Sequence, residues 1–131
     1  WLSDSVLDAK DRITDQTYFL PDFETKVVDS LADLTDGSLD NVINQNANGN
    51  VISPSSTAAR RVWAGTFPSG ELANHNCGDW DTSEGLFGGV GRLDRANGRW
   101  TRIARLGCAG RARLYCFQTD SSAFVENDFF P

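Results

Sequence analysis

The amino-acid sequence predicts an α+β fold in one domain, with a small twisted antiparallel sheet, one or two helices and long loops. Its 131 residues, of which 40% are hydrophobic, suit a single hydrophobic core. Helical periodicity is confined to the start of the chain, whereas short apolar and β-branched runs typical of strands fill the second half. All three cysteines also lie in the second half, and disulfides belong mainly to oxidising compartments.

The start of the chain has the pattern of a short amphipathic helix over residues 4–13. Ser3 and Asp4 are residue types that commonly cap a helix, and acids near the helix start favour its dipole. The apolar residues that fall roughly on one helical face are Leu2, Val6, Leu7 and Ile13.

The remainder of the first half predicts short extended pieces and loops. Residues 18–21 form an expected extended segment that ends at a proline. Residues 41–43 predict a short strand. Residues 44–56 are rich in Asn, Gly, Ser and Pro, which indicates a loop.

The second half carries the expected strands of the main sheet. Residues 61–66 predict a buried central strand. Asn97 and Gly98 are a strong hairpin-turn signal, and the alternating residues 99–104 that follow predict a half-buried strand. Residues 113–117 predict the last strand.

Residues 118–131 predict a C-terminal tail. The apolar residues between Phe124 and Pro131 indicate that the tail packs on something, either this domain or a neighbouring chain. Packing on a neighbour would suit an oligomer or a fibre.

Charge is unevenly distributed along this acidic chain. The net charge is -6, yet the stretch from Arg92 to Arg113 contains seven arginines and one acid, Asp94. Acidity overall argues against nucleic-acid binding. The arginines have two interpretations: a contact site for an anionic glycan or protein, or solvated positions paired with the acidic half. The candidate ligand-binding residues are Trp80, Arg92, Arg95, Arg99, Arg102 and Arg105.

Several pieces of the second half resemble C-type-lectin-like domains. The family has a core strand similar to residues 62–66, then a cysteine that corresponds to Cys77. A Gly-x-Trp piece matches residues 98–100, and two further cysteines match Cys108 and Cys116, which lie eight positions apart. The resemblance implies a fold with a small sheet and long ordered loops.

The chain is more specifically similar to the endostatin-like surface proteins and lipoproteins of bacteria. The shared pieces are Trp-Leu-Ser at residues 1–3, Leu-Thr-Asp-Gly-Ser-Leu at 34–39, Val-Trp-x-Gly-Thr at 62–66, Cys-x-x-Trp at 77–80 and Arg-Leu-Tyr-Cys-Phe at 113–117. Their order and spacing carry the resemblance, which spans most of the chain. It implies an extracellular or cell-surface location.

The resemblance also implies a disulfide between Cys77 and Cys108. Such a bond would stabilise the fold by about 3–4 kcal/mol through the unfolded state. Cys116 would then pair with a cysteine on an upstream segment that this chain lacks. The same segment would hold the first strand and helix of the fold. The alternative is that Cys116 is a buried thiol.

The usual calcium-dependent sugar site of the family is expected to be absent. Thr101 and Arg102 stand where the Asn and Asp ligands would be, and an arginine there opposes a divalent cation. Asp79, Asp81 and Glu84 form a weak alternative set of carboxylates whose spacing is not that of an EF-hand. A solvated polar loop is the favoured interpretation of these residues.

Enzymatic activity and a cofactor are not expected. The sequence has no Gly-x-Ser-x-Gly elbow and no phosphate-binding glycine loop, and His75, the only histidine, lies in a polar loop without a nearby nucleophile. Trp63 and Trp100 are expected in the core. Trp80 is also interpreted as a core residue, with partial exposure in its loop as the alternative, which would suit a stacking contact.

We therefore expect an extracellular adhesion or ligand-recognition module that binds a protein or a polyanionic glycan. The expected contact surface comprises residues 66–91 and 92–113. A structural domain of a surface fibre or multi-chain assembly is the alternative, and an unrecognised enzyme is a third. No apolar stretch in the sequence reaches the ~18–20 residues of a membrane helix.

Overall fold

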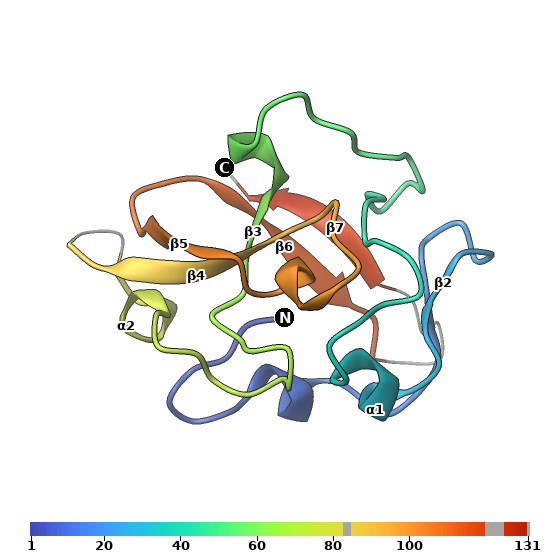
Figure 1. Ribbon diagram of the computed structural model, residues 1–131, viewed down its shortest axis with the longest axis horizontal. Helices are drawn as coiled ribbons and strands as arrows, with labels where there is room; N and C mark the ends of the chain where they lie inside the picture. The colour runs from blue at the N-terminus through green and yellow to red at the C-terminus, as the bar shows by residue number, and fades with distance from the viewer. Residues whose placement is uncertain (83–84, 120–124, 131) are drawn as a thin grey trace.

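The computed structural model describes residues 1–82, 85–119 and 125–130, and these form an α+β fold (Figure 1). The helices are short: η1 Ala9–Arg12, α1 Leu31–Leu34, η2 Ala58–Arg60, α2 Cys77–Trp80 and η3 Gly98–Trp100, of which the η elements are 3-10 turns. The strands are β1 Tyr18–Phe19, β2 Lys26–Val28, β3 Arg61–Trp63, β4 Phe87–Arg92, β5 Ala104–Gly107, β6 Ala112–Phe117 and β7 Val125–Phe130.

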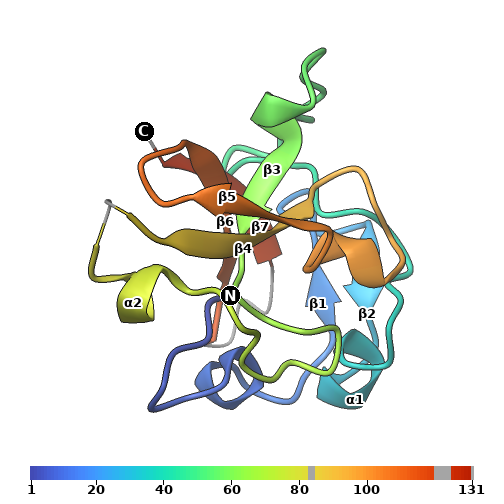
Figure 2. The ribbon, with the colours of Figure 1, turned by 60° about the vertical axis from the view of Figure 1, so that its left-hand side comes forward.

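The main sheet has five strands in the order β5-β4-β3-β6-β7, and β1 pairs with β2 separately (Figure 2). The expectation of an antiparallel sheet is wrong at one pair, because β3 and β6 run parallel through Val62–Arg113 and Trp63–Leu114. Strand patterns predict hairpins between neighbours in sequence, whereas this pairing joins segments about fifty residues apart. The strand predicted at residues 113–117 is confirmed as β6, and the one predicted at residues 61–66 is confirmed in its first half, as β3 Arg61–Trp63.

The expected C-terminal tail is in large part a strand of the sheet. β7 pairs antiparallel with the whole of β6, from Ala112–Phe130 to Phe117–Val125. Val125 is fully buried, and the Asn127 N–H donates to the Gln45 carbonyl at 2.7 Å. This segment therefore packs on its own domain, and both edges of β6 are occupied by strands of this chain. Phe124 and Pro131 lie outside the described residues.

The helix expected over residues 4–13 is wrong except for the single turn Ala9–Arg12. The Asp4 carboxylate accepts hydrogen bonds from the backbone N–H groups of Val6 at 2.8 Å and Leu7 at 2.9 Å. The buried Ser3 hydroxyl likewise accepts from the Ala9 N–H at 2.8 Å. These local side-chain bonds compete with a helical ladder, which is why the capping residues form a loop instead.

The strand expected over residues 99–104 is also wrong in its position. Asn97 caps the turn Gly98–Trp100 by accepting from the Arg99 N–H at 3.0 Å, so the Asn-Gly pair begins a helical turn rather than a hairpin. The strand begins only at Ala104. Residues 41–43 form no strand, whereas residues 18–19 are extended as predicted, in β1.

Aromatic side chains dominate the core between the sheet and the N-terminal half. The Trp1 ring lies 5.1 Å from that of Trp100, which in turn lies 5.3 Å from Tyr115. The Tyr115 hydroxyl donates to the Trp100 carbonyl at 2.7 Å, and burial raises its pKa well above the usual value, so it remains a donor. Trp63 and Trp100 are buried, as predicted.

Candidate functional site

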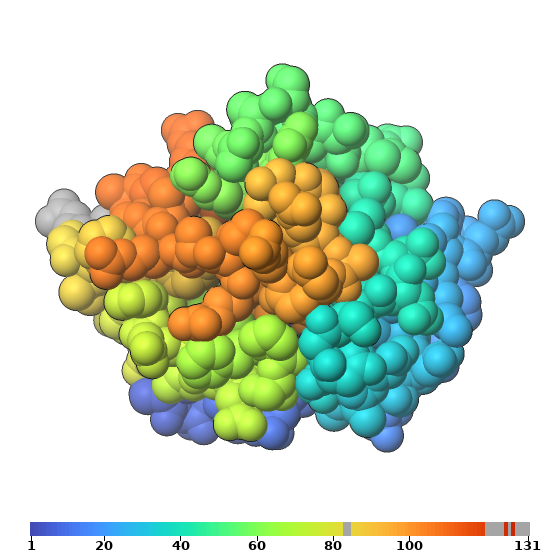
Figure 3. Space-filling model, in the orientation of Figure 1, coloured from blue at the N-terminus to red at the C-terminus, as the bar shows by residue number. Residues whose placement is uncertain are grey.

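A pocket of about 290 Å³ opens between two segments far apart in the sequence. In Figure 3 the orange segment around residue 105 lies against the lime segment around residue 70. The lining residues are Thr66, Ala73, Asn74, His75, Gly89, Thr101, Arg102, Ile103, Ala104 and Arg105. This volume lies near the lower end of the roughly 300–1,000 Å³ of ligand pockets.

Hydrogen bonds within the fold fix both walls of the pocket. The Gly89 N–H donates to the His75 carbonyl at 2.8 Å, which ties the loop to β4. The Thr101 hydroxyl donates to the Thr66 carbonyl at 3.0 Å, and both threonines are buried. The hydroxyl donors of the two threonines at the floor of the pocket are therefore already bonded within the fold. The polar groups that remain available to a ligand lie at the rim.

Both arginines of the pocket are held against phenylalanine rings. The Arg102 guanidinium lies 4.6 Å from the centre of the Phe67 ring, and that of Arg105 lies 4.2 Å from the centre of Phe87. The His75 ring packs edge-on against the same Phe87, with ring centres 6.2 Å apart. Cation–π contacts of this kind orient a guanidinium while its N–H donors remain available to an anion.

The pocket is cationic because nothing neutralises its arginines. In the part of the chain that the structure describes, Arg102 and Arg105 have no carboxylate within 4.0 Å. All ten lining residues lack a carboxylate as well. Two guanidiniums beside a concave, partly desolvated surface concentrate positive potential there, which favours an anionic ligand.

The other candidate arginines do not join this pocket. Arg92 forms a two-point ion pair with Asp94, with Nε–Oδ1 and Nη2–Oδ2 distances of 2.9 and 2.7 Å. This pair holds the pKa of Asp94 below its usual value. Arg95 is half-buried, with its Nε enclosed, and Arg99 is exposed on η3. Two of the five predicted arginines therefore come together, and three lie elsewhere.

The disulfide Cys77–Cys108, with Cα atoms 5.8 Å apart, joins the segments that follow the two walls of the pocket in sequence. Cys77 follows His75 by two residues, and Cys108 follows Arg105 by three. The bond therefore ties together the two segments that carry the pocket's charged groups. The pairing is the one that the resemblance implied.

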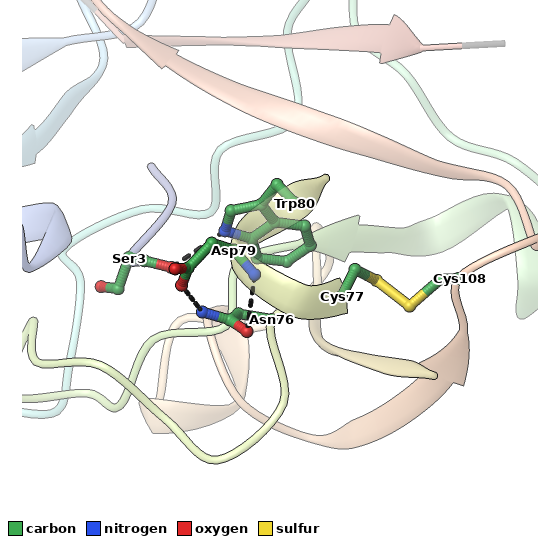
Figure 4. Close-up of a disulfide and its surroundings, with 6 residues drawn as sticks. All are labelled: Ser3, Asn76, Cys77, Asp79, Trp80 and Cys108. Atoms are coloured by element: carbon green, nitrogen blue, oxygen red, sulfur yellow. Dashed lines mark hydrogen bonds between the residues drawn. A yellow bond between two sulfur atoms is a disulfide. The ribbon is translucent and has the colours of Figure 1, made fainter. Parts of the chain in front are cut away.

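The α2 turn that holds Cys77 is left-handed throughout. Its four residues have φ values of 54°, 61°, 62° and 64°, and only Gly78 adopts such angles without strain. Figure 4 shows two of the groups that hold it: Asn76, which exchanges hydrogen bonds with Asp79, and Trp80, whose Nε1 donates to the Ser3 carbonyl at 2.9 Å. A strained turn persists only where surrounding contacts determine it, and here they are numerous.

Trp80 is half-buried, which matches the alternative of partial exposure rather than the favoured core position, and it lies outside the cationic pocket. It lines a separate groove of about 660 Å³ beside the disulfide, together with Leu2, Trp63 and Leu114. Gly65 makes room for its ring, since a Cβ there would lie 2.6 Å from Trp80 Cζ2. The structure thus separates Trp80 from Arg102 and Arg105.

Of the acidic loop residues, Asp79 and Asp81 belong to no group of three metal-ligating side chains within the described residues. Asp79 accepts hydrogen bonds from the backbone and side chain of Ser5, which lower its pKa, and from Asn76. Asp81 is exposed at the Trp80 groove, and Glu84 lies outside the described residues.

Elsewhere in residues 1–82, 85–119 and 125–130, one group of three carboxylates converges: Asp29, Asp33 and Asp40. The Lys26 ammonium already bridges Asp29 at 2.7 Å and Asp40 at 3.3 Å. An internal cation therefore compensates this cluster.

Cys116 lies half-buried on β6 and is a thiol rather than half of a disulfide in this structure.

Comparison of the chain with protein-family models, with curated proteins and with solved structures found no match. None of the described helices has the length and apolar character needed to cross a lipid bilayer.

His75 lies within the expected contact surface of residues 66–91, but the sequence assigned it no role of its own. The sequence places it in a polar loop about thirty residues from Arg102 and Arg105, and no local pattern links them. The one available signal was its position two residues before a cysteine of the implied disulfide, which draws the two segments together.

Proposed function

We propose that this protein is an extracellular recognition module of C-type-lectin-like type that binds an acidic saccharide through the cationic pocket. The observation that carries the proposal is the pair Arg102 and Arg105, each stacked on a phenylalanine ring and lacking a carboxylate within 4.0 Å among the described residues. The disulfide suits the oxidising compartment that such a role requires.

The shape of the site favours a saccharide over an acidic protein surface. Protein partners usually bury broad areas of roughly 800 Å² per side, whereas this pocket is concave and small. Sulfate or carboxylate groups would accept hydrogen bonds from the two guanidiniums, and the exposed amide of Asn74 is placed at the rim for a sugar hydroxyl. Binding of this kind does not need the calcium ligands of the usual sugar site in C-type-lectin-like domains.

The proposal is tested by titrating the protein with dextran sulfate at several salt concentrations. We expect saturable binding that weakens steeply with salt, because charge-based contacts are screened. The double variant Arg102→Gln/Arg105→Gln should lose at least about tenfold in affinity, since each lost charged hydrogen bond contributes roughly 1.5–3 kcal/mol.

Arg111→Gln is the matched control, because Arg111 is exposed and lines the Trp80 groove rather than the cationic pocket. It removes the same charge from the same stretch of sequence. Equal losses for the control and for single pocket variants would mean that net charge alone drives binding. Absence of binding by the wild type would refute the proposal.

A further inference from the structure

The only histidine of the chain lies inside the cationic pocket, where its charge state affects what the pocket binds. Imidazole is the side chain that ordinarily changes charge between pH 5 and 8. Resting on the proposed function, we infer that His75 is a specificity-determining residue that makes binding of the acidic ligand tighten as pH falls. Protonated, it becomes a third cation and a second N–H donor at the same site.

Three contacts place the imidazole where a bound anion would meet it. The Gly89 N–H holds the His75 carbonyl at 2.8 Å, so the backbone is fixed to β4. The imidazole ring packs edge-on against Phe87, the ring whose face carries Arg105 at 4.2 Å. His75 and Arg105 therefore share one aromatic support and both line the pocket.

The charged residues that line the pocket with His75 are cations, so no carboxylate of the lining compensates the charge of a protonated imidazole. Arg102 and Arg105 lie on the opposite wall of the pocket. The lining residues on β4 and on the loop of residues 66–75 are uncharged apart from His75. Glu71 and Asp79 are the nearest acids in sequence, four residues away on each side. Glu71 lies 3.9 Å from Lys10, and Asp79 is held by Ser5 and Asn76.

The sign of the effect follows from this arrangement. Protonation of His75 adds a third positive charge to a pocket that already carries two guanidiniums. A bound sulfate compensates all three, so protonation and anion binding favour each other. Affinity is therefore highest at low pH and falls as the imidazole loses its proton.

The experiment measures the affinity for dextran sulfate, a probe without carboxylates, from pH 5.5 to 8.0 at constant ionic strength. We expect the wild-type affinity to fall about tenfold over this range, the worth of one charge-assisted hydrogen bond. His75→Asn and His75→Gln should bind as the wild type does at pH 8.0 and lose the pH dependence. Two amide variants guard against a packing defect in either one.

Two results would overturn the inference: wild-type affinity that does not change with pH, or His75 variants that keep the wild-type pH profile. Both leave the proposed function intact, provided that Arg102→Gln/Arg105→Gln still weakens binding at least about tenfold. A wild type that fails to bind dextran sulfate at any pH overturns the proposed function and the inference together.

Discussion

Two short parts of the same arginine-rich stretch behave differently in the fold. Arg92 points its guanidinium at Asp94 and closes an internal ion pair, whereas Arg102 and Arg105 lie over aromatic rings and face a pocket. The sequence gives all three the same charge. Charge density along a sequence is therefore a poor guide to surface potential, which depends on the acids that the fold brings near.

Position in the sheet explains the difference. Arg92 ends β4, an inner strand, at a place where the backbone is closely packed, because a Cβ on Gly91 would lie 2.0 Å from the Trp100 carbonyl oxygen. Arg105 lies on β5, an edge strand of the sheet, and Arg102 comes just before it. Side chains at an edge reach solvent, whereas those beside the packed strand pair internally.

The largest expected effect contrasts two glycines of these parts. Gly91→Ala should destabilise the protein by at least about 4 kcal/mol or prevent folding, because the added methyl overlaps the Trp100 backbone. Gly107→Ala in β5 is the control, since nothing lies within 4 Å of its added Cβ, and should change stability by less than about 1 kcal/mol. Urea unfolding measures both, and equal losses would contradict the contrast in packing.

The next effect tests whether the disulfide supports the pocket side of the molecule. Cys77→Ser/Cys108→Ser should lower the free energy of unfolding by about 3–4 kcal/mol and weaken dextran sulfate binding, because the bond joins the segments of His75 and Arg105. The wild type treated with a reductant should lose a similar amount. Unchanged binding in a folded, reduced protein would show that the pocket is fixed without the bond.

A pair of single arginine variants separates stability from binding. Arg92→Gln should lower the free energy of unfolding by about 1 kcal/mol and leave saccharide affinity unchanged, because its partner is internal. Arg102→Gln should leave stability nearly unchanged and weaken dextran sulfate binding about fivefold or more. Chemical denaturation and titration of both variants provide the measurement. If Arg92→Gln weakened binding and Arg102→Gln lowered stability, the distinction between the two parts would be wrong.

The smallest effect is the pH dependence of stability contributed by Asp94. Its pKa in the folded protein is lowered from the usual value near 3.8, first by hydrogen bonds from Arg92. The carboxylate therefore contributes stability that is present above that usual value and is lost as pH falls below it. Asp94→Asn should unfold with a shallower loss of stability between pH 5 and pH 3 than the wild type. Identical profiles would mean that this pair adds nothing to acid stability.

Local sequence patterns determined the strand cores and the buried tryptophans. β3 and β6 appear where apolar and β-branched runs predict them, because such runs have one stable way to bury their side chains. Trp63 is in the core for the same reason, whereas Trp100 is buried although it lies on the turn η3 and not on the expected strand. The α+β class follows from these elements.

Only the tertiary structure decided what depends on partners distant in sequence. Local signals failed for a different reason at Asp4 and Asn97, because each side chain accepts a hydrogen bond from an N–H group two residues further on, in a turn other than the predicted one. The parallel pairing of β3 with β6 is settled by the packing of the sheet. The meeting of His75 with Arg102 and Arg105 has the same origin, since a pocket is formed by contacts between segments and no single segment contains it.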